Sequence, residues 1–124
     1  TLTNLYINSM KKSYFIENDN EVIKILKKNC QKICKDNEFE IIFGNAIDIL
    51  DKKLIIEPSI IFIDPPYKKE NINLILKKII KNKIKNNNTF IVIETAREEN
   101  INIPKGLSFI KEKIYGKTKI LFLN

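Results

Sequence analysis

A rigid acidic segment follows an apolar run near the middle of the chain: "FIDPPYKK", residues 62–69. Two successive prolines, Pro65 and Pro66, fix φ and remove two N–H donors, so the chain after Asp64 is a stiff extended turn. The Asp64 carboxylate and the Pro65 carbonyl are thereby held side by side, and Tyr67 offers a flat face to a planar ligand. This trio suits the exocyclic amine of a nucleobase, because its two N–H groups need two fixed acceptors.

Two polar residues upstream also close apolar runs. Glu17 ends "SYFIE" and, next to a nucleotide cleft, could accept hydrogen bonds from both hydroxyls of a ribose. Asn45 follows "FEIIFG" and could bond an adenine edge or cap the helix after it. Purely structural roles remain open for the same residues. Glu17 could be a surface residue, Asn45 could cap a helix, and the Asp-Pro-Pro segment could simply end a strand.

The elements that position these residues alternate along the chain. Short β-rich runs predict strands at 13–17, 39–44, 59–64 and 88–95. Helical spacing predicts helices within 18–37, 45–53 and 70–85, the first with Asp19 as N-cap and with Val22, Leu26, Cys30 and Ile33 on one face. Two alternating runs around Tyr115-Gly116-Lys117 predict an antiparallel hairpin. This order indicates a doubly wound α/β sheet, with ligands bound beyond the carboxyl ends of its parallel strands.

Composition limits the remaining possibilities. The 124 residues suffice for one domain, 1–124, and carry 22 basic against 15 acidic residues, for a formal charge of +7. All the basic residues except Arg97 are Lys, in a chain rich in Ile, Lys and Asn, so the charge is weak support for a polyanionic partner. Without histidine, Cys30 and Cys34 lack the further ligands of a zinc site. No membrane-spanning or signal segment is recognisable, so we expect a cytoplasmic protein.

The motifs together resemble a known enzyme family. In order and spacing, the chain is similar to the S-adenosylmethionine-dependent amino-methyltransferases with a DPPY-type motif, most closely the bacterial enzymes that methylate the N2 amine of a guanine in small-subunit ribosomal RNA. The resemblance rests on "YFIENDN", "GNA", "FIDPPYKK", "IVIET" and "KIYGKTKILFL". It implies a Rossmann-like class I methyltransferase sheet, S-adenosyl-L-methionine as cofactor, and ribosomal RNA or an assembling small ribosomal subunit as partner, with no metal and a monomeric state.

The resemblance also implies roles for individual residues. Glu17 would hold the cofactor ribose, and Asn18, Asn45 and Ala46 would line its adenine. Asp64, Pro65, Pro66 and Tyr67 would hold the target guanine. Lys68 and Lys69 would lie near RNA phosphates, and Arg97 could contact phosphate from the loop after "IVIET". Glu94, in that same stretch, would help to shape the cleft.

Two departures from the family qualify these expectations. Asn45 stands where the family usually has Asp, so a hydrogen bond to the adenine would lack charge assistance. The family's first strand and glycine-rich cofactor loop have no counterpart here, and residues 1–12 resemble the later part of the helix that follows that loop. We therefore expect the strands 13–17 and 59–64 each to have an unpaired edge. We also expect the chain to be an N-terminally incomplete piece of a longer protein or a truncated relative, and to bind the cofactor weakly.

Other functions are compatible with the same motifs. DNA adenine and protein glutamine methyltransferases share the motif group, although they often have Asn as the first motif residue or an added recognition domain. A catalytically inactive remnant that binds RNA through its basic surface would show salt-dependent RNA binding without cofactor binding.

Overall fold

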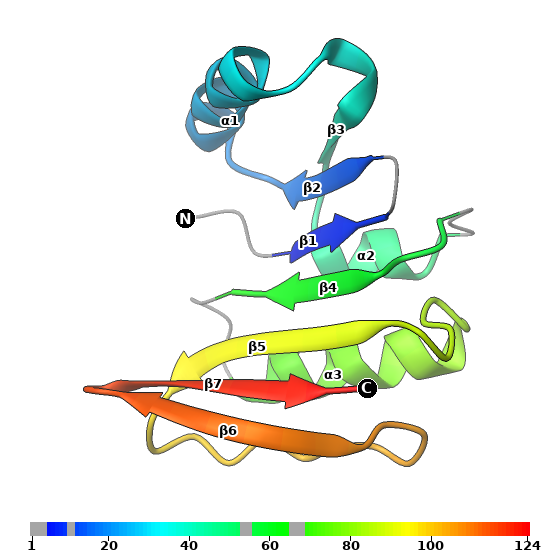
Figure 1. The fold of residues 1–124 in the computed structure, drawn as a ribbon, viewed down its shortest axis with the longest axis vertical. Coiled ribbons are helices and arrows are strands. Elements are labelled where there is room, and N and C mark those ends of the chain that lie inside the picture. Colours follow the sequence, from blue (N-terminus) through cyan, green and yellow to red (C-terminus); the bar gives the residue numbers. More distant parts are fainter. Residues whose placement is uncertain (1–4, 10–11, 53–55, 65–68) are drawn as a thin grey trace.

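The computed structural model describes residues 5–9, 12–52, 56–64 and 69–124. They form a seven-stranded sheet of order β3-β2-β1-β4-β5-β7-β6 with helices on both faces (Figure 1). The strands are β1 Leu5–Asn8, β2 Ser13–Glu17, β3 Phe39–Phe43, β4 Ile60–Ile63, β5 Phe90–Ala96, β6 Phe109–Tyr115 and β7 Thr118–Leu123. The helices are α1 Asn20–Ile33, the short 3-10 helix η1 Asp36–Glu38, α2 Ala46–Leu50 and α3 Lys69–Lys81.

Five strands of the sheet, β2, β3, β4, β5 and β6, run in one direction. β2 pairs with β3 in parallel, and β4 pairs with β5 in parallel. β1 is antiparallel to both β2 and β4, so those two strands share a direction as well. The carboxyl ends of β2, β3, β4 and β5 therefore meet at one edge of the sheet, which confirms the predicted arrangement of the three strand ends.

The C-terminal hairpin is also confirmed. β6 and β7 are antiparallel, and β7 pairs with β5 in the opposite direction. Tyr115 pairs with Thr118 across the turn, where Gly116 has φ +57°. A left-handed residue at this position suits a tight two-residue hairpin loop, and glycine adopts it without steric cost.

The hydrophobic core lies between one face of the sheet and the helices α2 and α3, which both lie behind the sheet in Figure 1. Alternate residues of the central strands point into it, so that Ile61, Ile63, Ile91 and Ile93 have no exposed surface. The predicted apolar face of α3 meets them with Ile75, Leu76 and Ile79, which are equally buried. Each such side chain stabilises the fold by about 1.5–3 kcal/mol.

α1 covers the opposite face, over β2 and β3 alone (Figure 1). Asp19 caps it as predicted, accepting hydrogen bonds from the backbone N–H groups of Glu21 and Val22 at 2.9 and 3.3 Å. Cys30 is buried and Cys34 half-buried, both as free thiols. Ile33 was expected on the same inner face but, as the last residue of α1, is 84% exposed. No helix in the described ranges is long and apolar enough to cross a membrane.

The prediction for the start of the chain is wrong for residues 5–8. They form strand β1 instead of helix, and β1 lies between β2 and β4, with Leu5 level with both Ile16 and Ile63. β1 thus pairs the two edges that were expected to be open, although it runs antiparallel to its neighbours. Unpaired backbone groups beside a buried sheet are costly, and this pairing satisfies them. The sheet is therefore continuous across the position where the family's first strand was expected.

Replacing Ile7 tests the position of β1. Ile7 is 1% exposed at the centre of the sheet, so Ile7→Ala should lower the free energy of unfolding by about 2–4 kcal/mol in urea denaturation. The matched control is Ile25→Ala on α1, where Ile25 is 60% exposed and the loss should stay within about 0.5 kcal/mol. Equal, small losses in both variants would show that residues 5–8 are not a core strand.

Candidate active site

Three carboxylates share one row at the carboxyl edge of the sheet. Ile16 and Ile63 are level across β1, and Ile63 is level with Ile93. Glu17, Asp64 and Glu94 each follow one of these isoleucines, so they form the next row, on the face opposite the α2–α3 core. Strand spacing separates Asp64 from Glu94 by about 5 Å and from Glu17 by about 10 Å, measured along the row between backbones.

Glu17 has an unusual environment for a glutamate that ends a strand. Its side chain is 1% exposed, and its Oε1 accepts a hydrogen bond from the Asp19 backbone N–H at 3.1 Å. Oε2 is buried as well, and within the described part of the chain it has no hydrogen-bond partner. A buried carboxylate oxygen normally has a donor, so this atom is suited to receive one from a ligand hydroxyl.

Asp64 and Glu94 lie side by side, both half-buried. Burial, together with the hydrogen bond and the negative charge of Glu94, raises the pKa of Asp64 to about 7. Glu94 is held firmly, because β5 continues two residues beyond it and pairs it with Ile120 of β7. Sequence reasoning gave Glu94 only a shaping role, since its closeness to Asp64 depends on a strand register that the sequence does not reveal.

The loop after β3 places the residues expected to line an adenine. Gly44 has φ +152°, and a Cβ there would come within 3.0 Å of Ile49, so the turn into α2 requires glycine. Asn45 then caps α2, its Oδ1 accepting from the Ile47 N–H at 2.8 Å, while its side chain stays exposed. The capping role left open by the sequence is thus confirmed. Ala46 is buried, and Asn18, which follows β2, is exposed.

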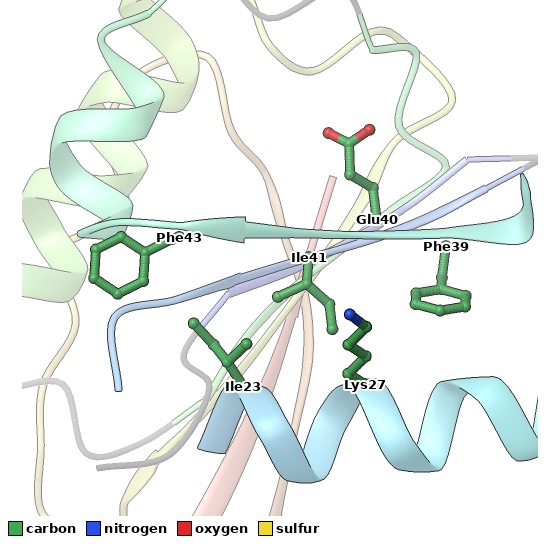
Figure 2. A pocket seen from close by; sticks show the side chains of 6 residues that line it. All are labelled: Ile23, Lys27, Phe39, Glu40, Ile41 and Phe43. Atoms are coloured by element: carbon green, nitrogen blue, oxygen red, sulfur yellow. The ribbon is translucent and has the colours of Figure 1, made fainter. Parts of the chain in front are cut away.

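An apolar pocket of about 300 Å³ lies between α1 and β3 (Figure 2). It is on the same face of the sheet as the carboxylate row, because Phe43, which lines it, is level with Glu17. Ile23 and Lys27 of α1 line it, with Phe39, Glu40, Ile41 and Phe43 from β3. Phe43 is 62% exposed and is level with Glu17 on the neighbouring strand. A flat aromatic side chain therefore lies beside the buried carboxylate, a feature that the sequence analysis missed.

Other predicted site residues are placed only in part. Pro65, Pro66, Tyr67 and Lys68 lie outside the described residues, and Lys69 begins α3.

Arg97 is exposed directly after β5, and its backbone N–H donates to the Lys117 carbonyl at 2.9 Å. Arg97 and the exposed Lys117 therefore come together at the edge that carries Asp64. Within the described ranges, no three Cys, Asp or Glu side chains are grouped as metal ligands would be.

Asp64→Asn tests the strained carboxyl pair through thermal stability. The pKa of Asp64 is raised from 3.8 to about 7, so the folded state holds the proton more tightly than the unfolded state, and the fold loses this contribution as the pH rises from about 4 to 7. The Asn side chain carries no charge at any pH, so the variant does not lose this contribution. The melting temperature of Asp64→Asn should match the wild type near pH 4 and exceed it by roughly 2–5 °C at pH 8.5, allowing for solvent screening.

Differential scanning fluorimetry across this pH range measures the effect. Glu98→Gln, which removes one exposed carboxylate after β5, is the control and should leave the difference near zero at every pH. A melting temperature for Asp64→Asn that falls below the wild type at pH 8.5 would contradict the account of the pair.

Comparison with known proteins agrees with this architecture. A family model described as conserved hypothetical protein 95 matches residues 8–124. The ribosomal RNA small subunit methyltransferase D of Buchnera aphidicola is 37% identical over 107 residues, covering 82% of this chain and 53% of that protein.

Two solved structures have the same fold. A Haemophilus influenzae protein described as a candidate methylase has a TM-score of 0.80 at 26% identity, over 91% of this chain and 65% of that one. An Escherichia coli protein described as a candidate methyltransferase has a TM-score of 0.81 at 23% identity, over 91% and 63%.

The chain spans about half the length of the Buchnera relative and less than two thirds of either solved chain. The match nevertheless includes all seven strands except the first three residues of β1. The carboxyl-edge site and the C-terminal hairpin both lie inside it. The chain therefore belongs to the conserved hypothetical protein 95 family, a methyltransferase family with a class I methyltransferase fold.

Proposed function

We propose that this chain carries the site for S-adenosyl-L-methionine-dependent methyl transfer to the N2 amine of a guanine in small-subunit ribosomal RNA. The observation that carries the proposal is the buried Oε2 of Glu17, which has no partner among the described residues and lies in one row with the Asp64 carboxyl. The separation of about 10 Å between Glu17 and Asp64 suits a ligand that is bound at one end by Glu17 and reacts at the other end near Asp64. The relatedness to a small-subunit ribosomal RNA methyltransferase supports the substrate class.

Glu17 would hold the cofactor through its ribose. Its free oxygen is an acceptor for a hydroxyl, and its burial strengthens that hydrogen bond. Asn18 and the Asn45-Ala46 turn would lie along the adenine, with the exposed ring of Phe43 as an apolar neighbour. The bound cofactor supplies a methyl group on a positively charged sulfur.

Asp64 would orient the guanine amine. In its ionised form it accepts one amine N–H, while the Pro65 carbonyl takes the second and Tyr67 stacks on the flipped base. The amine lone pair is delocalised into the ring, so transfer depends on this alignment and on a negative charge near the nitrogen as positive charge develops there. No covalent enzyme intermediate is needed.

The RNA backbone would follow the basic residues at the same edge. Arg97 and Lys117 are exposed beside the end of β5, and Lys68 and Lys69 follow the proline segment. The formal charge of +7 favours this partner. We propose that the protein acts as a monomer in the cytoplasm, on ribosomal RNA or on an assembling small ribosomal subunit.

Asp64→Ala in the chromosomal gene tests the proposal in the protein as the cell makes it. Removing the acceptor should abolish one N2-methylguanosine in small-subunit ribosomal RNA, measured by nuclease mapping and mass spectrometry. The purified variant should still bind S-adenosylhomocysteine within a few-fold of the wild type, because Asp64 faces the substrate amine.

The control is Glu98→Gln, which should retain the methylated guanine. Unchanged ribosomal RNA methylation in Asp64→Ala, with loss of a methyl mark on DNA adenine or protein glutamine, would assign the site to another amine. Unchanged methylation of all three, with salt-dependent RNA binding and no cofactor binding by the wild type, would indicate an RNA-binding remnant.

A further inference from the structure

The adjacency of Asp64 and Glu94 lowers the stability of the fold when both carboxyls are ionised. Their strands pair in parallel up to Ile63 and Ile93, whose side chains enter the core on the other face. Like charges on neighbouring strands are destabilising, and half-burial increases that cost. A packed sheet gains nothing from two carboxyls at this position, which suggests that the pair serves the chemistry of the site.

In the part of the chain that the structure describes, no ion pair compensates this repulsion. Ile120 of β7 lies on the far side of Glu94, and the first cation in that direction, Lys113, is one strand further on β6. On the β1 side, the next titratable group of the row is another carboxylate, Glu17. On the β7 side, the phenol of Tyr115 lies at the hairpin turn. Among the described residues, neither Asp64 nor Glu94 forms an ion pair. Within the described ranges no ion pair offsets the two charges, whereas a shared proton or a positively charged ligand would.

We infer that Glu94 is a positioning residue for methyl transfer, which acts through Asp64 so that the two carboxyls together receive and release the proton displaced from the substrate amine. This inference rests on the proposed function. It gives Glu94 a second task as well, because its charge adds to that of Asp64 at the point where the amine nitrogen becomes positive.

The carboxyl pair takes up the proton that methyl transfer displaces from the amine. With both carboxyls ionised, the pair accepts an amine N–H through Asp64. The nitrogen–carbon bond forms as the carbon–sulfur bond breaks, and the electron pair of that bond stays on sulfur. The proton then passes from the nitrogen to Asp64, is shared with Glu94, and leaves to water, which restores the ionised pair.

The raised pKa of Asp64, about 7, fits this exchange, because a proton acceptor works best when it gains and loses its proton near the working pH. A carboxyl at its ordinary pKa would be a much poorer acceptor at neutral pH. The transfer rate should therefore rise with pH through about 7 and level off above it.

Two measurements on Glu94→Gln test the inference. The first is an NMR titration of the Asp64 carboxyl carbon in the full 124-residue chain, which needs no substrate. Its midpoint should lie near pH 7 in the wild type, and the variant should have at least about tenfold lower proton affinity, while staying above the ordinary value because burial remains.

The second measurement is the pH profile of kcat/KM for methyl transfer to small-subunit ribosomal RNA, made on the enzyme as isolated from its own cells. The rising limb should move to lower pH in Glu94→Gln, and the rate at pH 8 should fall about three- to tenfold. Glu94→Asp should restore the wild-type limb in part, and the exposed control Glu98→Gln should change neither the titration nor the profile.

Each result decides the question. An Asp64 midpoint that is unchanged in Glu94→Gln overturns the pairing. A shifted midpoint with an unmoved rate limb overturns the role in transfer. Absence of transfer by the wild-type enzyme, with a coupled titration still present, contradicts the proposed function and the role in transfer but leaves the carboxyl pair itself established.

Discussion

Backbone pairing on both sides of β1 is the interaction on which the site depends. β1 joins the β3-β2 pair to the β4-β5-β7-β6 group, and its register sets Ile16 level with Ile63. Glu17 and Asp64 share a row and a face only because of that register. A slip of one residue on either side of β1 would turn one of these carboxyls toward the α2–α3 core, where a charge has no partner.

The two faces of the sheet have different physical tasks. The face toward α2 and α3 is a dense layer made mostly of isoleucine and leucine, and its burial stabilises the fold. The opposite face carries an oxygen of Glu17 that has no partner within the described ranges, and the adjacent Asp64 and Glu94 carboxyls, all unfavourable in a protein without a ligand. Stability from the first face allows the second to hold groups arranged for a ligand, a division that is common at functional sites.

Much of this could be predicted from local sequence. Strands 59–64 and 88–95 are continuous apolar runs, and Asp19 and Gly116 act through capping and turn chemistry that involves only neighbouring residues. β1 could not be predicted, because a four-residue segment becomes a strand only when its neighbours offer backbone partners on both sides. The closeness of Asp64 to Glu94 follows from strand register, which short motifs do not contain.

Binding of the cofactor along the carboxylate row is tested by a titration of S-adenosylhomocysteine, followed through amide chemical shifts. We expect shifts at Asn18-Asp19, at Asn45–Ile47 and next to Asp64. Glu17→Gln should bind at least about tenfold more weakly, and the exposed control Glu112→Gln should bind like the wild type. Shifts confined to the α1 side of the pocket, or equal binding by Glu17→Gln, would contradict this mode of binding.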